Sequence, residues 1–255
     1  MAAHLSTLWY VDSPRPVLAL RNYPDPHTES AASLARTLFG EDVTHVGTAP
    51  LADVAAGSEG VLHIGVFPGV TVVCLPLPDG MLPSQLPQQW RRRDGQGRTL
   101  LVMSSEDGAR GSFAEWHGKD LHRAFCADAA HIFEDHGLPQ PWEQPFWGGE
   151  FPMKYPLNVL PDPQMLPFHP QHFAESANRE WLGFRYTAVG PEDDINPAKL
   201  LVHTFRAGAP EVTAAPADVQ DLATVGGGKR PPRRRPSLMR WFGFRSKRDR
   251  IALQS

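Results

Sequence analysis

Short apolar runs broken by turn residues fill the first half of the chain, and their alternation predicts an antiparallel sheet. Two such runs flank Pro68-Gly69 and two more flank Gly118-Lys119-Asp120, so each pair is expected to form a β-hairpin. The expected strands are residues 7–11, 43–46, 61–67, 70–75, 99–103, 113–117, 121–126 and 200–205, with residues 129–133 continuing the meander.

Apolar residues at helical spacing predict two principal helices. The first is expected to start at Pro26, with Asp25 as its N-cap, and to end at Gly40. Its apolar face consists of Ala31, Leu34, Ala35 and Leu38. The second is expected to run from Pro170 to Gly183, and a short third helix is expected within residues 84–92. The apolar face of the second helix consists of Phe173, Ala174, Ala177 and Trp181.

Residues 139–170 have a different composition, with nine prolines and six aromatic residues among 32 positions. So many prolines exclude a long helix or a central strand, and so many rings are unlike the composition of disordered chains. We expect an ordered, extended arm whose rings are mostly buried against the body, and an aromatic-lined binding groove is the alternative. The rings belong to Trp142, Phe146, Trp147, Phe151, Tyr155 and Phe168.

These elements together predict an α+β fold in a single domain, residues 1–207, with an antiparallel sheet of hairpins, two principal helices and the arm. After Arg206 the composition changes to Ala, Gly, Pro and polar residues, which is typical of a flexible linker over residues 208–228. Residues 229–255 are then expected to form a disordered, basic amphipathic tail.

The tail changes the charge balance of the chain. The whole chain has a net charge of −3, yet residues 229–250 hold ten Lys/Arg and one acidic residue, a charge of +9. The other residues carry 15 basic and 27 acidic groups, a charge of −12. Such asymmetry indicates a segment that meets an anionic partner. The residues expected to bind this partner are Arg233, Arg234, Arg235, Arg240, Trp241, Phe242 and Arg245.

Four interpretations of the tail stay open from the sequence. Arginines interleaved with Trp241 and Phe242 suit the interface of an anionic membrane, where each basic residue contributes on the order of 1 kcal/mol. The same composition suits nucleic-acid phosphates, with bases stacked on the rings. An acidic protein is a third partner, and a solvated tail with no specific partner is the fourth interpretation.

Candidate chemistry in the body is sparse. Cys74 and Cys126 are the only cysteines, and the apolar strands around them predict burial rather than nucleophilic reactivity. His169 and His172 flank a helix start and could converge on a metal. His131 and His136 are spaced for opposite faces of a strand. We expect no metal and no cofactor.

The chain contains no phosphate-binding loop, G-x-S-x-G elbow or H-E-x-x-H helix, so the sequence points to no recognised reaction. It also has no signal-peptide core and no apolar run of the roughly 18 residues that a membrane span requires. Because it has only two cysteines as well, we expect a soluble cytoplasmic protein that contacts the membrane peripherally through its tail.

Five blocks of the sequence resemble a family of uncharacterised actinobacterial proteins, a domain of unknown function. Four of them are T-L-W-Y-V-D from Thr7, G-V-F-P-G-V-T-V-V-C from Gly65, P-F-W-G-G-E from Pro145 and L-P-F-H-P from Leu166. The fifth is the helix that ends in L-G-F at Leu182. Together they cover about residues 5–206. The resemblance implies a shared fold and implies no activity or catalytic residue.

The sequence therefore leaves three interpretations of the function open. The first is a non-catalytic binding or adaptor module that its cationic, aromatic tail tethers to an anionic surface, expected to be a membrane. The alternatives are an enzyme of unrecognised type, with a pocket that contains His169 near the arm, and a protein whose tail binds nucleic acid. The geometry of titratable groups distinguishes these classes, because an enzyme needs such groups to converge in one concave pocket.

Overall fold

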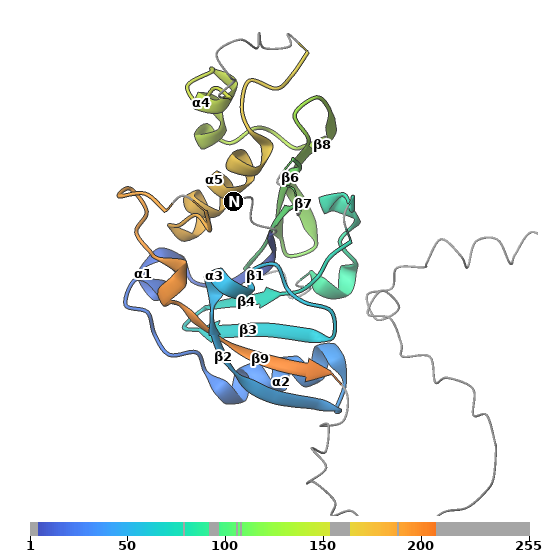
Figure 1. Cartoon of the computed structure of the whole chain (residues 1–255), viewed down its shortest axis with the longest axis vertical. Coiled ribbons are helices and arrows are strands. Elements are labelled where there is room, and N and C mark those ends of the chain that lie inside the picture. Colours follow the sequence, from blue (N-terminus) through green and yellow to red (C-terminus); the bar gives the residue numbers. More distant parts are fainter. Residues whose placement is uncertain are drawn as a thin grey trace, which may run out of the picture.

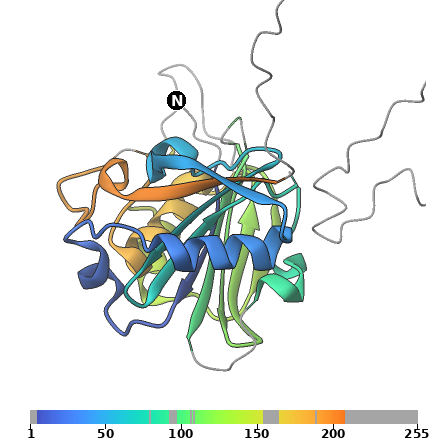
Figure 2. The same cartoon turned by 90° about the horizontal axis from the view of Figure 1, so that it is seen from below.

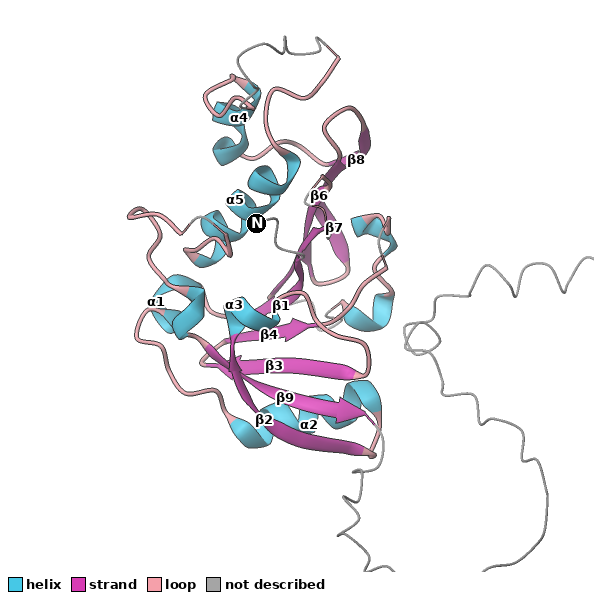
Figure 3. Ribbon diagram, in the orientation of Figure 1, coloured by secondary structure: helices cyan, strands magenta, loops and turns pink. Residues whose placement is uncertain are grey.

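The computed structural model describes residues 5–78, 80–91, 97–105, 107, 109–153, 164–187 and 189–207. Within these residues the chain forms one antiparallel sheet with helices packed against it, so the expected α+β fold is confirmed (Figures 1 and 3). The nine strands are β1 (Leu5–Val11), β2 (Val43–Pro50), β3 (Val61–Phe67), β4 (Val70–Cys74), β5 (Arg98–Ser104), β6 (Gly111–His117), β7 (Asp120–Ala127), β8 (Ile132–His136) and β9 (Leu201–Ala207). The expected linker (208–228) and basic tail (229–255) lie outside the described residues.

The order of strands across the sheet is β2-β9-β3-β4-β1-β5-β6-β7-β8. Both hairpins predicted from the sequence are confirmed, as β3–β4 and β6–β7. Two other strands pair with strands that are distant in the sequence. The first strand, β1, lies between β4 and β5, and the last, β9, returns to lie between β2 and β3. Both ends of the described chain are therefore hydrogen-bonded into the same sheet.

The helices are short apart from α2 and α5. Those of α type are α1 (Pro16–Leu20), α2 (Thr28–Phe39), α3 (Leu51–Val54), α4 (Gln144–Trp147) and α5 (Pro170–Leu182). The 3-10 turns are η1 (Pro83–Gln85), η2 (Gln88–Trp90), η3 (Pro141–Glu143) and η4 (Pro197–Lys199). The single helix expected within residues 84–92 is thus a pair of 3-10 turns, because Pro87 lies between them and lacks the N–H that a continuous helix requires.

Alternate residues of each strand enter two separate cores, one on each face of the sheet. On one face, Trp9 and Leu100 pack with the apolar side of α5. On the other face, Leu8 and Leu101 pack with α2 and with the segment 77–90. Figure 2 shows α2 lying across its face of the sheet. The predicted apolar sides of both principal helices therefore face the sheet from opposite directions.

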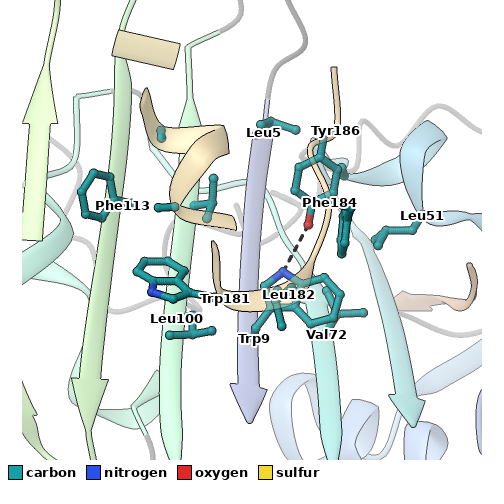
Figure 4. Packing of buried hydrophobic residues seen from close by; sticks show 14 of the residues in the cluster. Leu5, Trp9, Leu51, Val72, Leu100, Phe113, Trp181, Leu182, Phe184 and Tyr186 are labelled. Atoms are coloured by element: carbon teal, nitrogen blue, oxygen red, sulfur yellow. Dashed lines mark hydrogen bonds between the residues drawn. The ribbon is translucent and has the colours of Figure 1, made fainter. Parts of the chain in front are cut away.

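The core beneath α5 contains one polar contact that fixes the loop after this helix. The Trp9 Nε1–H donates a hydrogen bond to the Tyr186 hydroxyl at 3.1 Å (Figure 4). That hydroxyl donates in turn to Thr7 Oγ1 at 3.2 Å. Burial raises the pKa of Tyr186, so the hydroxyl stays protonated and keeps its donor. The loop after α5 is thereby joined to β1 at the centre of the sheet.

The start of α2 differs from the expectation. The helix begins at Thr28, and its N-cap is His27 rather than Asp25. The segment before it stays extended because His203 Nε2 contacts the Pro26 carbonyl at 3.1 Å, and His27 N–H donates to the Val66 carbonyl at 2.8 Å. The predicted end at Gly40 is confirmed, with φ of 92°, a value that favours glycine.

Both predicted ends of the second principal helix, α5, are confirmed. It begins at Pro170, in the first-turn position that tolerates a residue without an N–H. It ends at Gly183, whose φ of 83° is left-handed. The predicted face of Phe173, Ala174, Ala177 and Trp181 is buried.

The arm is described over residues 139–153 and 164–170, and it is ordered there. It is less extended than expected, because η3 and α4 form one short helical segment in it. Phe146 and Phe168 are buried, as predicted. Trp147 and Phe151 are 38% and 42% exposed, so the expected burial is wrong for these two rings. Successive residues of a helix point about 100° apart, so α4 can turn Phe146 inward only by turning Trp147 toward the edge.

A buried ion pair joins the arm to the far end of the sheet. Arg123 of β7 is 1% exposed, and Glu143 of η3 is fully buried. Their contact is bidentate, with Arg123 Nε donating to Glu143 Oε1 at 2.8 Å and Nη2 donating to Oε2 at 2.7 Å. Arg123 Nη1 also donates to Asp135 Oδ1 and to the His136 carbonyl on β8. A single guanidinium therefore connects β7, β8 and the arm.

The first prediction concerns this pair. Glu143→Ala leaves the Arg123 guanidinium buried with only part of its hydrogen bonding, and we expect it to lower the free energy of unfolding by about 3–5 kcal/mol. Asp135→Ala removes the other carboxylate on the same guanidinium, but that side chain is 44% exposed. It should cost no more than about 1 kcal/mol. Urea unfolding of both variants measures the difference, and equal costs would show that Glu143 is not the main partner.

The second prediction compares two rings of the arm. Phe168→Ala should cost about 3–5 kcal/mol, because this side chain is fully buried. Trp147→Ala should cost only about 1–2 kcal/mol, because more than a third of its surface is already in water. The same urea titration tests both variants. A larger cost for Trp147 than for Phe168 would contradict the observed exposure.

Candidate functional site

A cavity of about 540 Å³ lies where the arm passes the start of α5. The arm contributes Glu150, Phe151 and Pro152 to its lining. The helix and the loop that follows it contribute His169, Gln171, His172, Glu175 and Thr187. We call this hollow the arm pocket. Its volume is within the range of about 300–1,000 Å³ that is usual for small-molecule sites.

Local sequence explains why these side chains share one side of α5. Pro170 fixes the first turn, so His169 is the residue immediately before the helix and its side chain does not cap it. His172 and Glu175 follow at intervals of three residues, which places them along one side of the helix. Gly183 ends α5 and reverses the chain, so that Thr187 returns beside Glu175.

Glu175 is the most deeply buried charged group of the arm pocket, at 1% exposure. Its Oε1 accepts hydrogen bonds from Thr187 Oγ1 at 2.6 Å and from Gln171 Nε2 at 3.0 Å. Its Oε2 accepts one from the Thr187 backbone N–H at 2.7 Å. Burial raises the pKa of Glu175, and this effect outweighs the opposing effect of the three donors. Both oxygens are thus already engaged within the protein.

Of the two histidines of the arm pocket, His172 is half-buried and His169 is exposed. Burial lowers the pKa of His169, and burial together with the nearby charges of Arg185 and His169 lowers the pKa of His172. Both imidazoles are therefore neutral at neutral pH, and each offers one donor and one acceptor nitrogen. The His172 ring also makes edge contacts with Phe146 and Phe151, at centroid distances of 5.4 and 5.8 Å.

The arrangement suits the binding of a partly apolar molecule that carries hydrogen-bonding groups. Phe151 and Pro152 supply the apolar wall, while neutral His169 and His172 supply polar contacts without a net charge. Glu150 is the exposed charge at the edge. Glu175 fixes the shape of the wall through Thr187, because its oxygens accept hydrogen bonds from within the fold.

The pair His169 and His172, predicted from the sequence, is therefore brought together in one cavity. Across the described residues, no group of three or more His, Cys, Asp or Glu side chains is placed to hold a metal ion. His131 and His136 lie on the other side of the arm, in and beside β8, and take no part in the arm pocket.

The two cysteines are buried, as predicted. Burial raises the pKa of Cys74 and that of Cys126, which opposes formation of a thiolate nucleophile. Cys126 Sγ accepts a hydrogen bond from Arg110 Nε at 3.0 Å. The seven tail residues from Arg233 to Arg245 that were expected to bind an anionic partner lie outside the described residues.

Sequence reasoning missed Glu175, Gln171 and Thr187. No signal for Glu175 was present in the sequence, because at 100° per residue it lies about 160° from Phe173, away from the predicted apolar face. Its burial comes from segments that pack on that side of the helix, including the loop that carries Thr187. Thr187 had no signal either, since its place depends on the reversal of the chain after Gly183.

The fold and the arm pocket define a class: an α+β protein with a single antiparallel sheet and a ligand-sized cavity between a proline-rich arm and a helix start. The family of unknown function DUF6928 matches residues 5–205, and the chain belongs to this family. The matched residues contain the whole arm pocket and nearly all of the sheet. Comparisons with curated proteins and with solved structures find no match.

The third prediction concerns the raised pKa of Glu175. A carboxyl group with a raised pKa in the folded state stabilises the fold fully below its unfolded pKa of about 4.5, and this contribution is lost as the pH rises through the folded pKa. Glu175→Gln removes the titration, and its amide can still accept from the Thr187 N–H and donate to Thr187 Oγ1. The variant should therefore gain stability relative to the wild type as the pH rises from 4.5 toward neutrality.

Urea unfolding at pH 4.5, 5.5, 6.5 and 7.5 measures this difference. Glu180→Gln is the matched control, because Glu180 lies on the same helix and is exposed. Its pH profile should run parallel to that of the wild type. Parallel profiles for Glu175→Gln as well would show that folding does not raise the pKa of Glu175.

Proposed function

We propose that the chain is a binding module that its basic tail tethers to an anionic membrane surface, and that its ligand occupies the arm pocket. The observation that carries the tether is the segregation of charge, with +9 in residues 229–250 and −12 elsewhere. Attraction of this kind acts over a Debye length of roughly 8 Å at physiological salt. Trp241 and Phe242 add the apolar insertion that charge alone does not provide.

The geometry of the arm pocket supports binding more than catalysis. Both oxygens of Glu175 accept hydrogen bonds from within the fold, so this carboxylate is committed to positioning rather than to proton transfer. Among the described residues, neither His169 nor His172 makes a hydrogen bond to a carboxylate that would orient it as a general base. The pocket therefore offers shape and neutral polar contacts.

One observation favours the second candidate, an enzyme. His169, His172 and Glu175 are titratable, and all three converge on a single concave hollow. An enzymatic role requires a substrate that displaces Gln171 or Thr187 from Glu175, or that itself orients an imidazole. A change in the pKa of Glu175 on addition of a ligand would favour an enzyme over the binding module.

The proposed cellular location of the protein depends on the tail. No helix in the described part of the chain is long and apolar enough to cross a membrane. The proposed contact is accordingly peripheral, at the cytoplasmic leaflet, where anionic lipids attract basic segments. Nucleic acid and acidic proteins are the competing partners of the tail, and binding to DNA is measured beside binding to vesicles.

The fourth prediction is that the full-length chain co-sediments with vesicles containing phosphatidylserine and not with pure phosphatidylcholine vesicles. Trp241→Ala with Phe242→Ala should weaken this binding by about tenfold or more while keeping its salt dependence. Replacing Arg233, Arg234 and Arg235 with Gln should instead flatten the salt dependence. The control variants are Arg36→Gln on α2 and Leu138→Ala, whose side chain is 88% exposed.

Duplex and single-stranded DNA are measured at the same salt concentrations. Tighter binding to either DNA than to the anionic vesicles would replace the membrane proposal with a nucleic-acid one. Equal binding by the two control variants and the wild type shows that the body does not contribute to the contact.

A further inference from the structure

A second cavity, of about 550 Å³, lies at the opposite end of α5 from the arm pocket. Its lining includes Arg15, Arg98, Glu115, His117, Glu180 and Trp181. We call it the hairpin pocket, because His117 ends β6 beside the tight turn of the β6–β7 hairpin. His172 and Trp181 are nine residues apart, which is about 14 Å along α5 at 1.5 Å per residue, so the two cavities are separate.

One wall of the hairpin pocket is fixed by the buried carboxylate of Glu115, which is 5% exposed. Its Oε1 accepts hydrogen bonds from His117 Nε2 at 2.9 Å and from Arg98 Nη1 at 3.4 Å. Its Oε2 accepts one from Gln140 Nε2 at 2.6 Å. Burial alone would raise the pKa of Glu115, but His117, Gln140 and Arg98 together lower it. This wall therefore carries a fixed negative charge with ordered partners.

The imidazole next to Glu115 is oriented as well. Because His117 Nε2–H donates to the Glu115 carboxylate, the orientation of the imidazole is fixed. The His122 ring stacks on that of His117 with centroids 3.8 Å apart and planes inclined by 23°. Gln140 is fixed in its turn, because its Oε1 accepts from Trp142 Nε1 at 2.9 Å. The polar lining is thus preorganised rather than loosely solvated.

The lining combines both signs of charge with an apolar surface. Arg15 and Arg98 are the two arginines, Glu115 and Glu180 are the two carboxylates, and α1 contributes Val17. Trp181 adds a large ring, and its buried Nε1–H has no hydrogen-bond acceptor among the described residues.

From this combination we infer that the hairpin pocket binds a small zwitterion with an apolar body, of the chemical class of the apolar α-amino acids. The carboxylate of such a ligand pairs with Arg15 and Arg98. Its ammonium group pairs with Glu180, near the C-terminal end of α5, where the helix dipole favours positive charge. The apolar body lies against Val17 and Trp181. This site is independent of the arm pocket and of the tail.

Binding is tested on the full-length chain by titration calorimetry with leucine, phenylalanine and tryptophan. Two analogues of phenylalanine each lack one charge: 3-phenylpropionate lacks the ammonium group and phenethylamine lacks the carboxylate. We expect at least one amino acid to bind and each single-charge analogue of phenylalanine to bind about tenfold or more weakly than phenylalanine. No binding by any of the three amino acids at 10 mM, or equal binding of phenylalanine and both analogues, would overturn the inference.

Two substitutions at the exposed rim of the hairpin pocket test which residue binds each charged group of the ligand. Arg15→Gln should weaken phenylalanine and 3-phenylpropionate but leave phenethylamine unchanged. Glu180→Gln should weaken phenylalanine and phenethylamine but leave 3-phenylpropionate unchanged. Both residues are exposed, so the fold tolerates the changes. Arg36→Gln and Glu29→Gln on α2, at the opposite face of the sheet, are the matched controls and should change nothing.

Trp181→Phe keeps an aromatic side chain but replaces the indole with a smaller ring, which reduces the apolar wall of the hairpin pocket. It should weaken binding of the amino acids, and thermal unfolding of the variant checks that the core beneath α5 is intact. The inference would also be overturned if Arg15→Gln weakened the binding of phenethylamine and Glu180→Gln weakened that of 3-phenylpropionate. The two charged groups of the ligand would then have no complementary partners.

Discussion

The buried contact between Arg123 and Glu143 is the constraint on which both cavities depend. It sets the start of the arm against β7, and the backbone N–H of Gln140 donates to the same Glu143 carboxylate at 3.0 Å. Gln140 then reaches Glu115 in the hairpin pocket. In the other direction, η3 continues into α4, and the chain after α4 places residues 150–152 beside α5. Because a lone buried guanidinium is so unfavourable, the arm has one stable position on the sheet.

The helix α5 converts this fixed arm into two sites with different electrostatics. Its start has two neutral imidazoles and a carboxylate whose oxygens are occupied, whereas its end faces two arginines and two carboxylates. Between them, Phe173 and Trp181 pack against Phe113 at centroid distances of 5.4 and 5.8 Å. The dense aromatic layer separates the cavities, so a ligand in one has no open route to the other.

Features that depend on neighbouring residues were predictable from the sequence, and features that depend on distant contacts were not. The β3–β4 and β6–β7 hairpins and the ends of α5 follow from turn residues and periodicity within a few positions. The insertion of β9 between β2 and β3 is non-local, and so is the displacement of the α2 start to Thr28 by contacts from His203 and Val66. The pair His169 and His172 was visible in the sequence. Glu115 and Arg98 were not, because only the sheet register places them side by side.

The proposed tether must act against the charge of the rest of the chain. Residues outside 229–250 carry −12, of which −9 lies in residues 1–207 and −3 in residues 208–228, so an anionic membrane repels the body while it attracts the tail. The composition of residues 208–228 predicts a flexible coil, and 21 such residues span on average roughly 25 Å at about 5–6 Å times the square root of their number. This span is about three Debye lengths at physiological salt, over which the repulsion is largely screened. A linker with this predicted span would therefore let the two opposite charges act independently in the proposed tether.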